Sequence, residues 1–226
     1  MLPIMDVSRW QGNIDWDKVK ASGLVSGVML KTVSTNRKLS TRADGLYIDP
    51  TFERNYAECK RLGIPVGVYY YTYATDKEMA DAELSLLKTA LTGKTFELPI
   101  SVDVEDNKIK KLSTQALTDL AAYALATVEQ WGFYALLYVG LNFSQTELYM
   151  SGAALRKYDV WLAIYPSDKS KTKPEDKPKT DFAFGMWQYT STARVPGVSG
   201  NVDLSHAYKD YTKIIAKKGL TRLREV

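Results

Sequence analysis

Strand-like and helix-like segments alternate along this chain of 226 residues, and the alternation restricts the fold more than any single motif does. Apolar runs typical of strands occupy residues 3–7, 27–33, 65–73, 98–106, 133–139, 159–165, 182–189 and 199–204. Helical patterns lie between the early runs, over 15–20, 50–62, 75–91 and 113–131, and a last helix is expected over 205–218. Such an order favours a parallel sheet, and about eight strands favour a closed barrel of five βα units followed by three further strands.

Other folds and sites find little support. No Gly-rich phosphate-binding loop follows the first strand, so a dinucleotide-binding fold is not indicated. The only cysteine, Cys59, falls in a helical pattern and the only histidine is His206, which is expected to cap or cover a helix end. No internal disulfide and no Cys/His metal site can be built from one cysteine and one histidine, and a catalytic triad is not expected because His206 is assigned to a helix end. No metal and no cofactor are therefore expected.

Charge and hydropathy bear on location and partners. The first residues lack the basic and apolar regions of a signal peptide, and no apolar run approaches the ~18–20 residues of a membrane span. We therefore expect a protein made in the cytoplasm, without membrane insertion. The net charge of +4 lies in the segment after His206. This basic tail is either a solvated helix face or a patch for an anionic surface such as a cell-wall polymer, and no nucleic-acid partner is expected.

The strand over 98–106 ends in two acids, Asp103 and Glu105. Side chains alternate along a strand, so both acids share one face at roughly 6.5–7 Å along it. Two carboxyls that face the same way repel each other, and proteins commonly use such a pair for acid–base chemistry. The alternative is a solvated strand end that carries incidental acids.

The other strand ends supply further candidates. In a parallel barrel the site forms at the carboxyl ends of the strands, and closure makes the first and last strands neighbours. Asp6 and Asp203 are then expected to join Asp103 and Glu105, although Asp6 alternatively caps a helix or pairs with a cation, and Asp203 alternatively caps the last helix. The remaining candidates are mostly aromatic: Tyr69, Tyr71, Lys31, Tyr138, Trp161, Tyr165, Trp187 and Gln188. Half of the tyrosine stripe could equally be core, and Lys31 is expected to balance the acids rather than to act as a nucleophile.

Acids beside an aromatic wall suit carbohydrate chemistry. Sugar rings pack their C–H faces on aromatic rings, and cleavage of a glycosidic bond needs one protonated carboxyl and a second group that stabilises the transition state. Ionised Asp103 and Asp6 would raise the pKa of Glu105 and suit it to the acid role.

Several ordered motifs resemble one known family, glycoside hydrolase family 25, the Chalaropsis-type lysozymes that many bacteriophages use as endolysins. They are MDVSRWQGNIDW (5–16), GIPVGVY (63–69), VDVE (102–105), VWLAIY (160–165), WQYT (187–190) and VSGNVDL (198–204). The resemblance implies an α/β fold, an irregular TIM-like (β/α)5β3 barrel, as a single catalytic domain over 1–216. Residues 217–226, the end of the basic tail, would then either start a linker to a wall-binding domain or take the place of such a domain.

The resemblance also implies an activity. It is N-acetylmuramidase: hydrolysis of the β-1,4 bond after N-acetylmuramic acid in bacterial peptidoglycan, by a monomer released through a holin or lysis. By position, Glu105 resembles the general acid, Asp103 the carboxylate that orients the 2-acetamido group or stabilises the transition state, and Asp6 and Asp203 the other two acids. The expected carboxyl spacing lies between those of retaining and inverting enzymes, so both courses stay open.

This sequence departs from the family pattern at two places. Tyr70 stands where the family often has His, and KTVS (31–34) stands where it tends to have Lys-Ala-Thr/Ser followed by Glu or Gln. Both departures concern how the substrate is gripped. An inactive glycan-binding barrel, a chitinase-like glycosidase and a metal-dependent barrel enzyme remain as alternatives.

Overall fold

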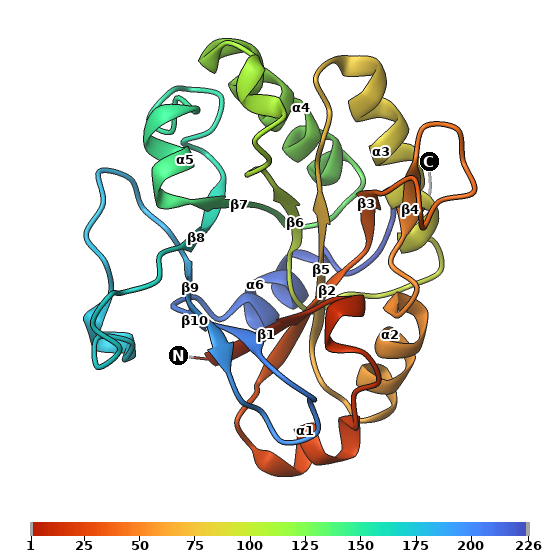
Figure 1. The fold of residues 1–226 in the computed structure, drawn as a ribbon, viewed down its shortest axis with the longest axis vertical. Coiled ribbons are helices and arrows are strands. Elements are labelled where there is room, and N and C mark those ends of the chain that lie inside the picture. Colours follow the sequence, from red (N-terminus) through yellow and green to blue (C-terminus); the bar gives the residue numbers. More distant parts are fainter. Residues whose placement is uncertain (1, 225–226) are drawn as a thin grey trace.

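The computed structural model describes residues 2–224 as a closed eight-stranded barrel with helices around it (Figure 1). Its strands are β1 (Leu2–Val7), β2 (Gly27–Lys31), β5 (Val66–Tyr71), β6 (Ile100–Asp103), β7 (Ala135–Gly140), β8 (Asp159–Ala163), β9 (Met186–Ala193) and β10 (Val202–Ala207). The helices are α1 (Trp16–Ser22), α2 (Phe52–Arg61), α3 (Lys77–Leu91), α4 (Thr114–Gln130), α5 (Leu141–Thr146) and α6 (Tyr211–Lys218). The predicted α/β barrel of TIM type is confirmed.

One strand runs against the rest. The order around the barrel is β1-β10-β9-β8-β7-β6-β5-β2, and β10 is antiparallel to both of its neighbours while all other pairs are parallel. Asp203 therefore lies at the start of β10, not at the end of a parallel strand as predicted. Because β10 is reversed, its start lies at the same end of the barrel as the carboxyl ends of the parallel strands. We call this end the mouth.

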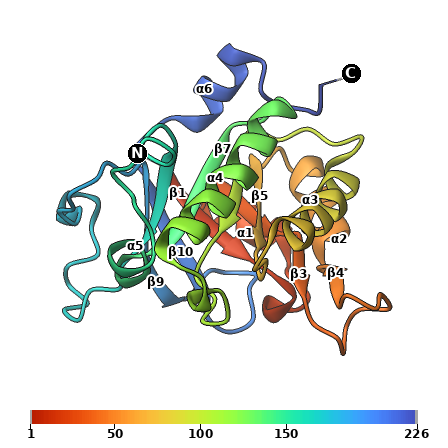
Figure 2. The ribbon, with the colours of Figure 1, turned by 90° about the horizontal axis from the view of Figure 1, so that it is seen from above.

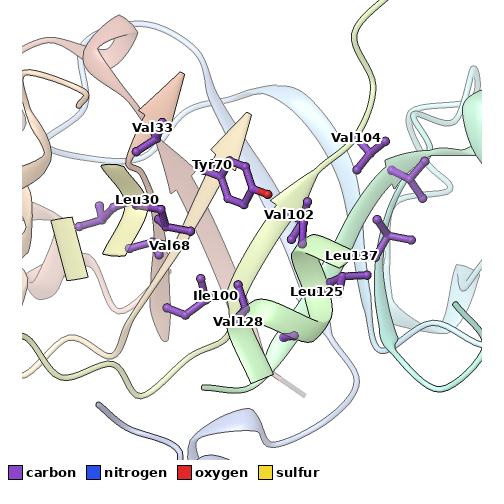
Figure 3. Packing of buried hydrophobic residues seen from close by; sticks show 14 of the residues in the cluster. Leu30, Val33, Val68, Tyr70, Ile100, Val102, Val104, Leu125, Val128 and Leu137 are labelled. Carbon is purple, nitrogen blue, oxygen red and sulfur yellow. The ribbon is translucent and has the colours of Figure 1, made fainter. Parts of the chain in front are cut away.

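The core has two layers, which follow from strand alternation. Outward-facing residues such as Ile100, Val102 and Leu137 pack against Leu125 and Val128 of α4 (Figure 3). Inward-facing residues of the strands form a second cluster with Tyr211 and Ile215 of α6. Helix α6 therefore closes the end of the barrel opposite the mouth, on the side where the chain begins (Figure 2).

The predicted boundaries need four corrections. A hairpin of β3 (Val33–Thr35) and β4 (Leu46–Ile48), which was not predicted, lies between the strand expected over 27–33 and the helix expected over 50–62, and α5 was not predicted either. β6 ends at Asp103, so Glu105 lies just beyond it. The last helix starts at Tyr211, because β10 continues through Ala207 and its cap is Asp210, which excludes Asp203 as that cap.

The basic tail is attached to the barrel as far as it is described. Lys217 and Lys218 belong to α6, the carbonyl of Thr221 accepts the N–H of Phe96 at 2.8 Å, and the N–H of Arg224 reaches Trp131 at 2.9 Å. Residues 225–226, which the sequence assigned to the same tail, lie outside the described residues. Among residues 2–224, the helices are all too short or too polar to cross a bilayer.

Candidate active site

A cavity of about 290 Å³ opens at the mouth of the barrel. It is lined by Asp6, Lys31, Tyr69, Tyr71, Asp103, Glu105, Tyr138, Trp161, Tyr165, Gln188, Ser191 and Asp203. A larger groove of about 640 Å³ lies on the flank beside α5, but its lining includes a single carboxylate, Asp181. The smaller cavity is the candidate active site because the acids converge there.

Strand pairing brings together two acids that lie near opposite ends of the sequence, Asp6 and Asp203. Asp6 on β1 is the register partner of Asp203 on β10, and both side chains face into the barrel. Burial raises the pKa of Asp6 well above its usual range, and the charge of Asp203 raises it further. Burial also raises the pKa of Asp203. Each of the two carboxyls therefore holds a proton more readily than an exposed aspartic acid does, which relieves the repulsion between them.

The other two acids lie on and just after β6. Burial, followed by the charge of Glu105, raises the pKa of Asp103 well above its usual range. Burial is also the main cause that raises the pKa of Glu105, with Asp203 and Asp106 adding to it and Lys31 opposing it. The sequence predicted a raised pKa for Glu105 alone, caused by ionised Asp103 and Asp6, whereas desolvation acts on the whole cluster.

Asp103 carries an unpaired polar atom. Its Oδ1 is buried and has no hydrogen-bond partner among the described residues, and the side chain is only 4% exposed. A buried oxygen without a partner is costly unless a ligand supplies a donor. Asp103 therefore suits an N–H or O–H group of a bound molecule.

Lys31 is the cation of the site. Its Nζ lies 5.0 Å from the ring centroid of Tyr71 and 5.8 Å from that of Tyr69. Burial lowers the pKa of Lys31, while the charges of Asp103 and Asp49 raise it. The ammonium thus partly offsets the acids, as the sequence predicted.

Gln188 joins the two sides of the cavity. Its Nε2 donates to Asp6 Oδ2 at 3.0 Å, and its Oε1 accepts from the hydroxyls of Tyr138 at 2.9 Å and Tyr165 at 2.6 Å. Trp161 stands edge-on to Tyr138 with 4.7 Å between centroids, and its Nε1 is bonded to Ser205 Oγ at 2.9 Å. The aromatic wall is therefore held by packing and hydrogen bonds before any ligand binds.

One predicted wall residue lies elsewhere. Trp187 was expected beside Gln188, but neighbouring residues of a strand point to opposite faces, so only Gln188 faces the cavity. The indole of Trp187 is fully buried in the outer core, where its Nε1 donates to the carbonyl of Ile164 at 2.9 Å. Tyr70 likewise faces outward and is buried, so the departure at that position lies outside the cavity.

Two further residues of the site were not predicted. Ser191 lines the cavity because β9 extends beyond residue 189 and its register with β10 shifts there, which breaks the strict alternation of faces, and the sequence carries no signal for either feature. Asp106 accepts a hydrogen bond from the hydroxyl of Tyr71 at 3.2 Å, and its position directly after Glu105 could have pointed to it.

The two other side chains with chemically reactive groups, His206 and Cys59, do not line the cavity. His206 lies on β10, not at a helix end as predicted; its ring stacks on Tyr189 at 4.2 Å and its Nε2–H donates to the carbonyl of Thr172 at 2.8 Å. Cys59 is buried, and burial raises the pKa of its thiol. Among residues 2–224, no three His, Cys, Asp or Glu side chains are arranged to hold a metal ion.

Comparisons with known proteins agree with this geometry. Residues 5–198 match Glycosyl hydrolases family 25. The Escherichia coli K12 protein YegX, itself uncharacterized, is 29% identical over 203 residues, which are 89% of this chain and 67% of YegX. This chain thus spans about two thirds of the length of that relative.

Two solved structures share the fold. The bacterial lysozyme from Streptomyces coelicolor is similar with a TM-score of 0.71 at 25% identity, over 95% of this chain and 95% of that chain. The modular autolysin LytC from Streptococcus pneumoniae, solved in complex with a synthetic peptidoglycan ligand, is similar with a TM-score of 0.68 at 27% identity, over 90% of this chain and 46% of LytC. The family match covers most of the barrel and includes the acids at positions 6, 103 and 105, and we conclude that this chain belongs to glycosyl hydrolase family 25.

Proposed function

We propose that this chain is a peptidoglycan hydrolase, a lysozyme or 1,4-β-N-acetylmuramidase. It would cleave the β-1,4 bond between N-acetylmuramic acid and N-acetylglucosamine in bacterial cell walls. The observation that carries the proposal is the cluster of four desolvated carboxyls beside a wall of fixed aromatic rings. The LytC complex with a peptidoglycan ligand and the Streptomyces coelicolor lysozyme of the same fold support the choice of substrate.

Glu105 is assigned as the proton donor. It is more accessible than Asp103, because β6 ends before it, and a proton donor must reach the glycosidic oxygen of a bound chain. Its raised pKa keeps the carboxyl protonated at a higher pH than an exposed glutamic acid would allow. Transfer of that proton to the leaving oxygen leaves positive charge on the sugar ring, which the remaining carboxylates stabilise.

Asp103 is assigned to the 2-acetamido group of the substrate. Its unpaired Oδ1 can accept the acetamido N–H, which orients that group next to the reacting carbon. Ionisation of Asp103 in the complex would also stabilise the developing positive charge. Asp6 is held by Gln188 and paired with Asp203, so these two complete the negative side of the cavity.

The test is digestion of purified peptidoglycan, followed by mass spectrometry for new reducing ends on muramic acid. Glu105→Gln should keep its melting temperature and lose at least about a hundredfold in kcat, because the amide cannot donate a proton to the leaving group. The matched control is Glu78→Gln, the same substitution at an exposed glutamic acid on α3 that does not line the cavity, and this variant should retain most activity.

Full activity of Glu105→Gln would overturn the assignment of the acid. Binding to cell walls without released fragments would indicate an inactive glycan-binding barrel instead. Faster hydrolysis of chitin than of peptidoglycan would indicate a chitinase-like enzyme, and loss of activity on adding a chelator would indicate a metal-dependent one.

A further inference from the structure

The end of β1 leads directly to an exposed tryptophan outside the cavity. Trp10 is 73% exposed, more than any other large apolar side chain in the described part of the chain. It lies in a short 3-10 helix, Arg9–Gln11, only a few residues after Asp6. Exposure of the largest apolar side chain has a cost in water, and such residues often mark binding sites.

The backbone that carries Trp10 is held in place. The N–H of Trp10 donates to Ser8 Oγ at 3.3 Å, and the N–H of Ser8 donates back to Gln11 Oε1 at 2.9 Å, which forms a capping box. Arg9 N–H donates to Asp49 Oδ2 at 2.9 Å. The exposure of Trp10 is therefore a feature of a fixed turn.

Two further interactions place this turn at the rim of the mouth. Gln11 Nε2 donates to the carbonyl of Asn201 at 3.3 Å, two residues before Asp203. The positive charge of Arg9 acts on Lys31 and opposes its protonation. The turn is thus bracketed by the segments that carry Asp203 and Lys31.

The side chains of the turn combine an apolar face with a cation. The guanidinium carbon of Arg9 lies 3.9 Å from the ring centroid of Trp10, so it covers one face of the indole and leaves the other open. An open indole face suits the C–H face of a sugar ring. The guanidinium suits a carboxylate, and the muramic acid units and peptides of peptidoglycan supply carboxylates.

The cavity itself is small for a polymer. Its 290 Å³ lies at the lower limit of ligand pockets, which run from about 300 to 1,000 Å³. Tyr165, which is 47% exposed, follows β8 and lies three strands from β1 around the barrel, close to the far side of the mouth. A glycan chain that passes over the acids therefore meets an exposed aromatic ring near each end of the cavity, Trp10 at one end and Tyr165 at the other.

We infer that Trp10 and Arg9 form a second glycan-binding platform at the rim, where the substrate chain stacks a sugar ring on the indole and pairs a carboxylate with the guanidinium. This inference rests on the proposed function, because it takes peptidoglycan as the ligand. It makes Trp10 and Arg9 determinants of polymer specificity that do not touch the reacting atoms.

The test compares two substrates. One is insoluble peptidoglycan, and the other is an aryl glycoside of the N-acetylglucosamine–N-acetylmuramic acid disaccharide, which lacks the longer glycan chain and the peptides of the polymer. Trp10→Ala should lower kcat/KM for the polymer about tenfold more than for the disaccharide, mainly through KM, and Trp10→Phe should restore most of the loss. The matched control is Tyr149→Ala, since Tyr149 is 52% exposed and does not line the cavity.

Arg9→Ala gives a second, electrostatic readout. It should weaken binding to the polymer about threefold at low salt, and the difference should vanish near 1 M NaCl because salt screens exposed charges. Equal losses on both substrates, no loss on either, or an equal effect of Tyr149→Ala would overturn the inference.

Pelleting with insoluble peptidoglycan separates this inference from the proposed function. If the wild-type protein hydrolyses neither substrate, the proposed activity fails, but the platform still predicts weaker pelleting of Trp10→Ala. If the wild-type protein is active, and Trp10→Ala binds and hydrolyses peptidoglycan as well as the wild type, the inference about the platform is wrong and the proposed function stands.

Discussion

At the scale of single residues, Lys31 sets the protonation of the acids around it. Its positive charge lowers the pKa of Asp103 and of Glu105 against the effect of burial. Lys31→Met should therefore raise both pKa values. A general acid works while it is protonated, so the basic limb of the pH profile of kcat/KM should move to higher pH. Measurement of that profile on peptidoglycan checks the prediction.

The matched variant is Lys31→Arg, which keeps the charge and should keep the basic limb near its wild-type position. If Lys31→Met lowers the rate without moving either limb, Lys31 acts through packing or substrate contact. The limbs belong to the coupled acids as a group, so the readout is the shift of the profile.

Residue types and spacing were enough to predict most of the cavity. Eleven of the twelve residues predicted to form the site line the cavity, and the exception is Trp187. The error has a simple cause, because Trp187 and Gln188 are adjacent on β9 and cannot share a face. Ser191 could not be predicted, since the length of β9 depends on its pairing with β10. The chemical roles of the acids stay a prediction until variants are assayed.

At the scale of elements, a buried acid fixes the connection between β5 and α3. Glu83 on α3 is 1% exposed, and it accepts hydrogen bonds from Thr72 Oγ1 at 2.6 Å and from the N–H of Tyr73 at 2.8 Å. The segment so held continues the strand that carries Tyr69 and Tyr71. Helix α3 thus supports one wall of the cavity through a carboxyl that the substrate does not reach.

Burial raises the pKa of Glu83 from 4.5 to about 7. The folded state therefore binds this proton more tightly than the unfolded state, and the stabilisation is complete below pH 4.5. It is lost as the pH rises towards 7, by roughly 3 kcal/mol in the free energy of unfolding. Urea denaturation of the wild type and of Glu83→Gln across this range measures the effect.

The amide of Glu83→Gln does not titrate, so the difference in unfolding free energy between the two proteins should change between pH 4.5 and 7 and stay flat above it. A difference that is constant from pH 4 to pH 8 would contradict the prediction. Both proteins share all other titrating groups, which cancel in the comparison.

At the scale of the whole molecule, closure of the barrel depends on small residues inside it. A Cβ at Gly67 on β5 would lie 2.5 Å from the carbonyl oxygen of Pro99 and 2.6 Å from the sulfur of Met29. Gly67→Ala should therefore force β5 away from its neighbours and destabilise the protein by about 1–3 kcal/mol. Chemical denaturation with a fixed m-value measures the loss.

Gly140→Ala is the matched control. Gly140 has a φ of −75°, and a Cβ there would meet nothing within 4 Å, so its effect should stay within about 1 kcal/mol. If Gly67→Ala is as stable as Gly140→Ala, the interior of the barrel accommodates a Cβ at residue 67 and the prediction is wrong.

The sequence by itself determined the local structure and the chemistry available. The order of strands and helices, the inward faces of β5 and β6, and the acids with their aromatic neighbours all follow from periodicity and residue type, which are local properties of the chain. Only the tertiary structure decided the reversed direction of β10, the antiparallel register that sets Asp6 directly opposite Asp203, and the burial that raises the pKa of every acid in the cavity. These features depend on contacts between distant segments, and desolvation in particular exists only once the barrel has closed around the acids.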